Sequence, residues 1–166
     1  EWNEHHNILK AFFPTNILTT KAVYDIQFGN LERPTHSNTS WDAAKFEVCG
    51  QKWADISEGN YGFSLLNDCK YGHSCEGGEL ALTLVRAGTD PNPMADIGHH
   101  SFTYSIYPHS GDFRNGTVQQ AYILNKPLVC VPALGEGKLP ESYSLVSCNK
   151  ENIIAETVKM AENGEG

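Results

Sequence analysis

Hydrophobic and polar residues alternate along most of the chain, with the period of a half-buried β-strand. Every second residue from Ala22 to Phe28 is apolar, and Lys45 to Val48 places Phe46 and Val48 on one face with Glu47 on the other. Successive side chains of a strand point to opposite faces of a sheet, so each pattern predicts a strand with one buried face. The predicted strands are Ala22–Phe28, Lys45–Val48, Tyr61–Leu66, Glu79–Arg86, His100–Tyr107, Pro127–Val131, Tyr143–Ser147 and Ile153–Lys159.

Turn residues separate these strands, and only one segment favours a helix. Gly77-Gly78 and Asp90–Pro93 are typical breaks between strands. The segment Thr117–Leu124 fits a couple of helical turns that end at Asn125-Lys126-Pro127. Many short strands with regular turns predict an all-β fold, an antiparallel β-sandwich with at most one short helix.

The length of 166 residues fits one domain, so we predict a single β-sandwich domain over residues 1–166. The chain starts at Glu1 rather than at Met, and the acidic, glycine-rich tail Ala161–Gly166 follows directly on a predicted strand. We therefore expect a fragment of a larger protein, with its C-terminal end truncated within the domain.

Charge and hydropathy argue against several partners. The net charge is −8, and the 12 Lys and Arg residues are scattered, whereas a nucleic-acid surface needs clustered cations. No apolar run approaches the length of a membrane span. The five cysteines are odd in number and contain no CxxC pair, which favours free thiols in a reducing compartment.

Motifs of catalytic or metal sites are missing from the sequence. Zinc needs three or four converging ligands, but the seven histidines show no HxH or HExxH spacing, so we expect no metal site in this chain. No GxSxG, P-loop or GxGxxG is present. The carboxylates Asp55, Glu58, Asp68 and Glu76 are close in sequence, and we interpret them as solvated groups that cap turns.

The most specific segment runs from Trp53 to Gly72, WADISEGNYGFSLLNDCKYG, and it places Asp68, Lys70 and Tyr71 on a loop after a strand. Functional residues often lie on such loops. Arg86 follows the face formed by Leu80, Leu82 and Leu84, so its guanidinium either pairs with a buried carboxylate or reaches a cleft. Two uses of the aromatic residues also stay open, stacking on sugar rings or packing in the core. These residues are Trp41, Trp53, Tyr61 and Tyr71.

Three ordered segments carry a resemblance to a known family. They are RPTHSNTSWDAAKFEV (Arg33–Val48), WADISEGNYGFSLLNDCKYG (Trp53–Gly72) and FTYSIYPHSGDFR (Phe102–Arg114). Together they resemble the C-terminal β-domain of glycoside hydrolase family 38 α-mannosidases of the cytosolic/vacuolar and bacterial type, and the likeness extends over essentially the whole chain. The resemblance implies a mutarotase-like super-sandwich fragment.

The resemblance implies a parent enzyme that hydrolyses terminal α-mannosyl linkages with retention. It also places the catalytic residues and the zinc in an N-terminal catalytic domain of the same protein, so the fragment alone is expected to be inactive and to hold no cofactor. The implied substrate-binding residues of this chain are Arg86, Asn67, Asp68 and Tyr71. The implied location is the cytoplasm, or the vacuole in a eukaryote. Two alternatives stay open: an autonomous carbohydrate-binding module, and a structural scaffold between domains or in a homo-oligomer.

Overall fold

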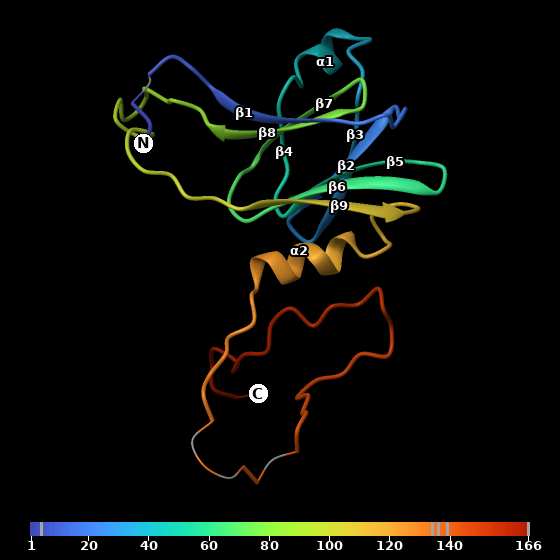
Figure 1. Cartoon of the computed structure of the whole chain (residues 1–166), viewed down its shortest axis with the longest axis vertical. Helices are drawn as coiled ribbons and strands as arrows, with labels where there is room; N and C mark the ends of the chain where they lie inside the picture. The colour runs from blue at the N-terminus through green and yellow to red at the C-terminus, as the bar shows by residue number, and fades with distance from the viewer. Residues whose placement is uncertain (4, 134, 136, 139, 166) are drawn as a thin grey trace. The chain divides into compact units, whose positions relative to one another are not determined.

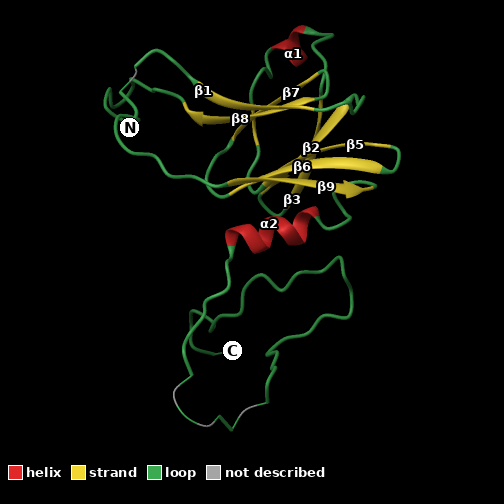
Figure 2. Cartoon of the chain, in the orientation of Figure 1, coloured by secondary structure: helices red, strands yellow, loops and turns green. Residues whose placement is uncertain are grey.

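The computed structural model describes residues 1–3, 5–133, 135, 137–138 and 140–165. The chain divides into unit 1, Glu1–Leu128, and unit 2, Val129–Gly166. All helices and strands of the described residues lie in unit 1 (Figures 1 and 2). In chain order they are β1 (Leu9–Pro14), β2 (Lys21–Ile26), β3 (Gly29–Pro34), α1 (Ser40–Ala43), β4 (Val48–Cys49), β5 (Trp53–Glu58), β6 (Tyr61–Asn67), β7 (Gly72–Glu76), β8 (Glu79–Val85), β9 (Tyr104–Ser110) and α2 (Thr117–Asn125).

Unit 1 is a sandwich of two antiparallel sheets. One sheet has the strand order β1-β8-β7-β4 and the other has the order β3-β2-β5-β6-β9. The two sheets form separate layers, and α2 lies against the five-stranded sheet (Figure 1). The predicted fold class, an all-β antiparallel sandwich, is thereby confirmed.

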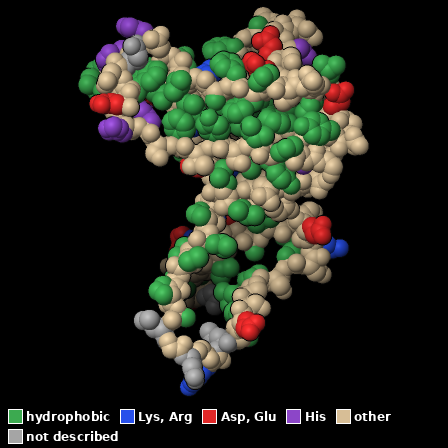
Figure 3. Space-filling view, in the orientation of Figure 1, with side chains coloured by type: hydrophobic (Ala, Val, Ile, Leu, Met, Phe, Trp, Pro, Cys, Tyr) green, Lys and Arg blue, Asp and Glu red, His purple; other side chains and the backbone are tan. Residues whose placement is uncertain are grey.

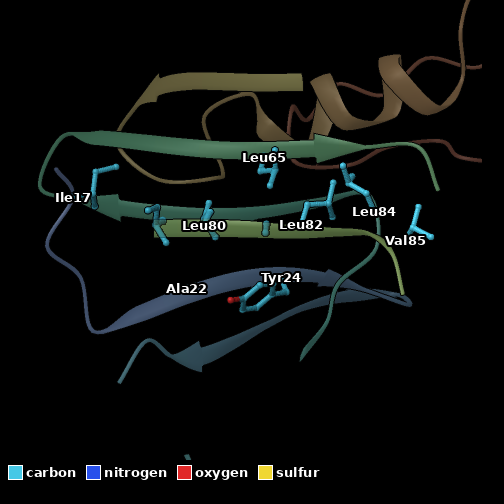
Figure 4. Close-up of a cluster of buried hydrophobic side chains, with 10 residues drawn as sticks. Ile17, Ala22, Tyr24, Leu65, Leu80, Leu82, Leu84 and Val85 are labelled. Carbon is cyan, nitrogen blue, oxygen red and sulfur yellow. The ribbon is translucent and has the colours of Figure 1, made fainter. Parts of the chain in front are cut away.

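The main core lies between the two sheets. Leu80, Leu82 and Leu84 of β8 point into it, as their alternation predicts, and meet Tyr24 of β2 and Leu65 of β6 (Figure 4). Complete burial of one such leucine side chain stabilises a fold by about 1.5–3 kcal/mol. The inward face of β8 therefore contributes strongly to holding the sheets together.

A second, smaller core lies on the other face of the five-stranded sheet. Trp53 of β5 and Leu66 of β6 pack there against Phe113 and against Ala121 of α2. The rings of Trp53 and Phe113 stack with centroids 5.0 Å apart. The predicted helix at Thr117–Leu124 is confirmed as α2, and its packing covers this face of the sheet.

The prediction for Lys45–Val48 is wrong. Only Val48 and Cys49 form a strand, and Phe46 is 73% exposed while the Glu47 side chain is only 12% exposed, the reverse of the predicted alternation. A capping box at Thr39 starts the unpredicted one-turn helix α1 just before this segment. Glu47 turns inward because hydrogen bonds and ion pairs from residues of β1 and the end of β8 hold its carboxylate.

The strand predicted at His100–Tyr107 is shifted. β9 begins only at Tyr104, which pairs with Asn67, the last residue of β6. Residues before Tyr104 have no partner strand on that side, since β6 has ended. β9 continues instead to Ser110, opposite Tyr61.

The three strands predicted at Pro127–Val131, Tyr143–Ser147 and Ile153–Lys159 are wrong. These segments have no regular secondary structure, and most of their large apolar side chains are exposed. A strand is stable only when it pairs with a neighbour and buries one face. Unit 2 has the alternation of strands but none of the pairing within the described residues. Gly166 of the predicted tail lies outside them.

No helix of the described residues is long and apolar enough to cross a membrane.

Candidate functional site

A cavity of about 280 Å³ collects the charged residues at the ends of β7 and β8. Two of the predicted site residues, Arg86 and Tyr71, line it together with Lys70 from the same loop. Glu47, Asp96 and His100 also line it, beside Thr83. The cavity therefore offers both hydrogen-bond donors and acceptors next to an exposed aromatic ring.

Glu47 organises this cavity. Its Oε2 accepts a hydrogen bond of 2.9 Å from Nη1 of Arg86, and its Oε1 lies 3.6 Å from Nζ of Lys10. The Thr83 hydroxyl donates a further hydrogen bond to Oε1. Gly72 makes room for the carboxylate, since a Cβ there would lie only 2.6 Å from Oε1. Glu47 thus fixes the direction in which Arg86 extends.

Arg86 fits both interpretations of its position, pairing with a carboxylate and reaching a cleft. It pairs with a mostly buried carboxylate, and it also lines the cavity, with 64% of its side chain exposed. Its main-chain N–H lies 3.3 Å from Oδ2 of Asp96, which also accepts from the N–H of Gly88. His100 contacts the Asp96 carbonyl at 2.8 Å. The end of β8 is therefore held from two sides while the guanidinium stays accessible.

Asn67 and Asp68 lie outside the cavity wall and shape the loop that carries Lys70 and Tyr71. Asn67 is buried, and its side chain accepts from the Lys70 N–H at 2.6 Å and donates to the Gln51 carbonyl at 2.8 Å. Oδ1 of Asp68 accepts from the N–H of Thr103 at 3.0 Å. A hydrogen bond from Cys69 holds the pKa of the Asp68 carboxyl below its usual range. Their direct role in substrate binding stays a prediction.

Three residues of the cavity, Glu47, Asp96 and His100, are not indicated as site residues by any sequence motif. Glu47 was predicted to face solvent from a strand, and the contacts that turn it inward come from residues distant in sequence. Asp96 lies in the connection after β8, where no periodic pattern guides a prediction, and His100 lies at the start of a predicted strand that begins only at Tyr104.

A buried cluster of Asp55, Ser64 and His109 resembles a hydrolytic triad in composition but not in geometry. Nε2 of His109 lies 2.6 Å from Oδ2 of Asp55 and 3.0 Å from Oγ of Ser64, so one nitrogen meets both partners. In a triad, opposite ring nitrogens contact the serine and the carboxylate. Ser64 also contacts the hydroxyl of Thr117 in α2 at 2.7 Å. The cluster therefore ties α2 to the sheet.

The interpretation of Asp55 as a solvated turn residue is wrong, because its side chain is fully buried in β5. Burial raises the pKa of its carboxyl, against the hydrogen bonds from Ser64 and His109. Gly62 lies opposite His109 in the sheet, and a Cβ there would be 2.1 Å from Cε1 of the imidazole. Only glycine leaves room for the ring.

The four candidate aromatic residues separate into a buried one and three exposed ones. Trp53 is 1% exposed and belongs to the second core, so it cannot stack on a ligand. Trp41, Tyr61 and Tyr71 are exposed.

Within the described ranges no three His, Cys, Asp or Glu residues are placed to hold a metal ion, so the His, Cys, Asp and Glu residues of this chain do not fit a zinc site there.

Comparisons with known proteins agree on one family. The family model described as "Glycosyl hydrolases family 38 C-terminal domain" matches residues 1–94. The human protein "Alpha-mannosidase 2C1" is 48% identical over 163 residues, which are 98% of this chain and 16% of that protein. "Alpha-mannosidase" of Saccharomyces cerevisiae is 42% identical over 168 residues, covering 98% of this chain and 15% of its own length.

A solved structure agrees with the fold. The chain superposes on an α-mannosidase from Enterococcus faecalis V583 with a TM-score of 0.68 and 26% identity, covering 80% of this chain and 16% of that one. The chain thus spans about a sixth of the length of these relatives.

Proposed function

This chain belongs to the family of C-terminal domains of family 38 glycosyl hydrolases, and we propose that it is the non-catalytic β-domain of a longer α-mannosidase. The parent enzyme is proposed to hydrolyse terminal α-mannosyl linkages with retention. The assignment is supported by relatives named α-mannosidase, each about six times longer than the matched region. In this proposal the catalytic residues and the zinc belong to an N-terminal domain of the same protein.

The observation that carries the role of this domain is the Arg86–Glu47 pair at the cavity. A mannoside presents hydroxyl groups that both donate and accept hydrogen bonds. Arg86 and Lys70 supply donors, Glu47 and Asp96 supply acceptors, and Tyr71 supplies an exposed ring. A guanidinium held by a partner loses little freedom when it binds a ligand, so it orients the ligand efficiently. The cavity is therefore proposed as one wall of the substrate cleft, with Asn67 and Asp68 supporting its loop.

An exposed apolar surface supports packing against another domain. Ile106 of β9 pairs with the fully buried Leu65 and points to the same side of the sheet, yet Ile106 is 49% exposed. Tyr104 shares that side and touches Phe13 of β1 with ring centroids 5.6 Å apart. Figure 3 shows a continuous band of hydrophobic side chains across this side of unit 1. Exposed apolar areas of this kind mark interaction surfaces.

The catalytic domain of the same protein is the proposed occupant of this apolar surface, and a homo-oligomer is the alternative. The proposed location is the cytoplasm. The five unpaired cysteines support that location, since a reducing compartment keeps thiols free.

The test compares the complete protein with the 166-residue chain, using p-nitrophenyl α-mannoside. We expect turnover by the complete protein and none by the chain alone. Arg86→Ala in the complete protein should lower kcat/KM by about tenfold or more, as loss of a charged hydrogen bond costs about 1.5–3 kcal/mol. Arg114→Ala is the matched control, because Arg114 is also exposed and paired with a carboxylate but does not line the cavity. Equal effects of the two variants would argue against a role for the cavity.

A further inference from the structure

We propose that a second cavity, separate from the one at Arg86, binds a neutral saccharide. It measures about 180 Å³ and lies where the connection from β3 to β4 crosses the edge of β7. β4 is only two residues long, and its register with β7 ends at Val48 opposite His73. The edge of β7 from Ser74 to Glu76 is therefore left without a strand beside it and lines the cavity.

The charges around this cavity favour a neutral ligand that both donates and accepts hydrogen bonds. Arg33 and Lys45 bring positive charge, and Asp42, Glu76 and Glu79 bring negative charge. A phosphate or a nucleotide would meet more carboxylates than cations here. A polyhydroxylated molecule can pair with both kinds of group, since each hydroxyl is donor and acceptor.

Arg33 provides a polar group that is not yet satisfied. Its Nη2 donates to the Cys49 carbonyl at 3.3 Å, and its guanidinium lies over the Tyr24 ring, 5.8 Å from the centroid. Its Nε is buried and has no hydrogen-bond partner among the described residues. A buried donor without an acceptor is costly, so a shift of the Arg33 side chain that turned this N–H toward a ligand hydroxyl would gain affinity.

Two aromatic rings supply the apolar part of the site. Phe12 of β1 and Phe46 both line the cavity, and both are exposed in spite of their size. Sugar rings have apolar faces that pack on aromatic side chains, while their hydroxyls bind the polar groups around them. The volume lies below the range of about 300–1,000 Å³ that is usual for drug-sized ligands. One sugar unit therefore suits this cavity better than a long oligosaccharide.

The test is a protein-observed NMR titration of the 166-residue chain with methyl α-mannoside, glucose and glucose 6-phosphate. We expect saturable shifts of the Phe46 and Ser74–Glu76 amides with a neutral sugar, and weaker binding of the phosphate. Phe46→Ala and Glu79→Gln should each weaken binding about fivefold or more, the effect of one lost hydrogen bond or ring contact. Phe28→Ala is the matched control, because Phe28 is a fully exposed phenylalanine outside the cavity.

Three outcomes would overturn this inference. They are the absence of saturable shifts with every sugar, shifts confined to Lys70–Tyr71 and Arg86, and unchanged affinity in both cavity variants. Preferred binding of glucose 6-phosphate would overturn the neutral class of ligand. None of these results bears on the proposed mannosidase role, which is tested by turnover of the complete protein and by Arg86→Ala.

Discussion

His73 makes the stability of the fold depend on pH. It lies in β7 and is fully buried, with its ring beside Tyr24 at a centroid distance of 5.9 Å. Gly50 closes the space on another side, since a Cβ there would lie 2.9 Å from Cδ2 of the imidazole. Neither ring nitrogen has a hydrogen-bond partner among the described residues. Burial therefore lowers the pKa of His73 from 6.5 to about 4, although the Glu47 carboxylate acts in the opposite direction.

The sign of the effect follows from proton binding. Between about pH 6.5 and pH 4 the unfolded chain binds a proton at His73 and the folded chain does not, so the free energy of unfolding falls as the pH falls. One pH unit corresponds to about 1.4 kcal/mol when a single proton is taken up. Across this window the loss amounts to about 3 kcal/mol, a large share of the roughly 5–15 kcal/mol that stabilises a typical domain.

The assay is urea denaturation followed by circular dichroism over this pH range. The variant His73→Leu removes the titrating group, so the difference in unfolding free energy between the two proteins should change by about 3 kcal/mol from neutral pH to pH 4. His99→Leu serves as the control, because His99 is exposed. If His73→Leu loses stability with falling pH as steeply as the unmodified chain, the assignment to His73 is refuted.

Three further predictions concern stability. Gly62→Ala should cost about 3–5 kcal/mol, because it displaces the His109 ring and takes from the buried Asp55 carboxyl its contact with His109; thermal unfolding checks this, and a shift of a degree or less would contradict it. Leu82→Ala should cost about 2–5 kcal/mol through the cavity it leaves in the main core, measured by urea denaturation against an exposed Leu18→Ala control. A chain that ends at Leu128 should keep the far-ultraviolet spectrum and the cooperative unfolding of unit 1, since the described strands and helices precede that residue; loss of cooperativity would show that unit 2 supports the sandwich.

The local pattern of residues predicts a strand or helix correctly where that pattern lies within the element itself. The leucines of β8 alternate with small residues, and the strand forms almost at its predicted bounds. α2 is short, but a proline follows soon after its end, and the helix forms as predicted. Alternation also predicts that Arg86 follows the leucine face, and its side chain lines the larger cavity.

Long-range contacts decided the features that the sequence did not predict. Asp55 is held in the core because Ser64 and His109 both contact its Oδ2, and His109 is 54 residues away in the chain. Glu47 faces inward because of Thr83 and Arg86. The alternation in unit 2 is typical of strands, but the predicted strands do not form. A strand needs a neighbour to pair with, and no local pattern supplies one.

Phe46 and Glu47 are consecutive residues that line different cavities. Phe46 lines the smaller cavity, while Glu47 holds Arg86 at the larger one. A ligand whose binding shifted the main chain at Phe46 would shift Glu47 as well, and with it the anchor of Arg86. Thermodynamic linkage requires such an effect to be reciprocal, so occupancy of either cavity would change the affinity of the other by the same factor. The peptide bond between Phe46 and Glu47 is therefore a direct covalent connection between the linings of the two cavities.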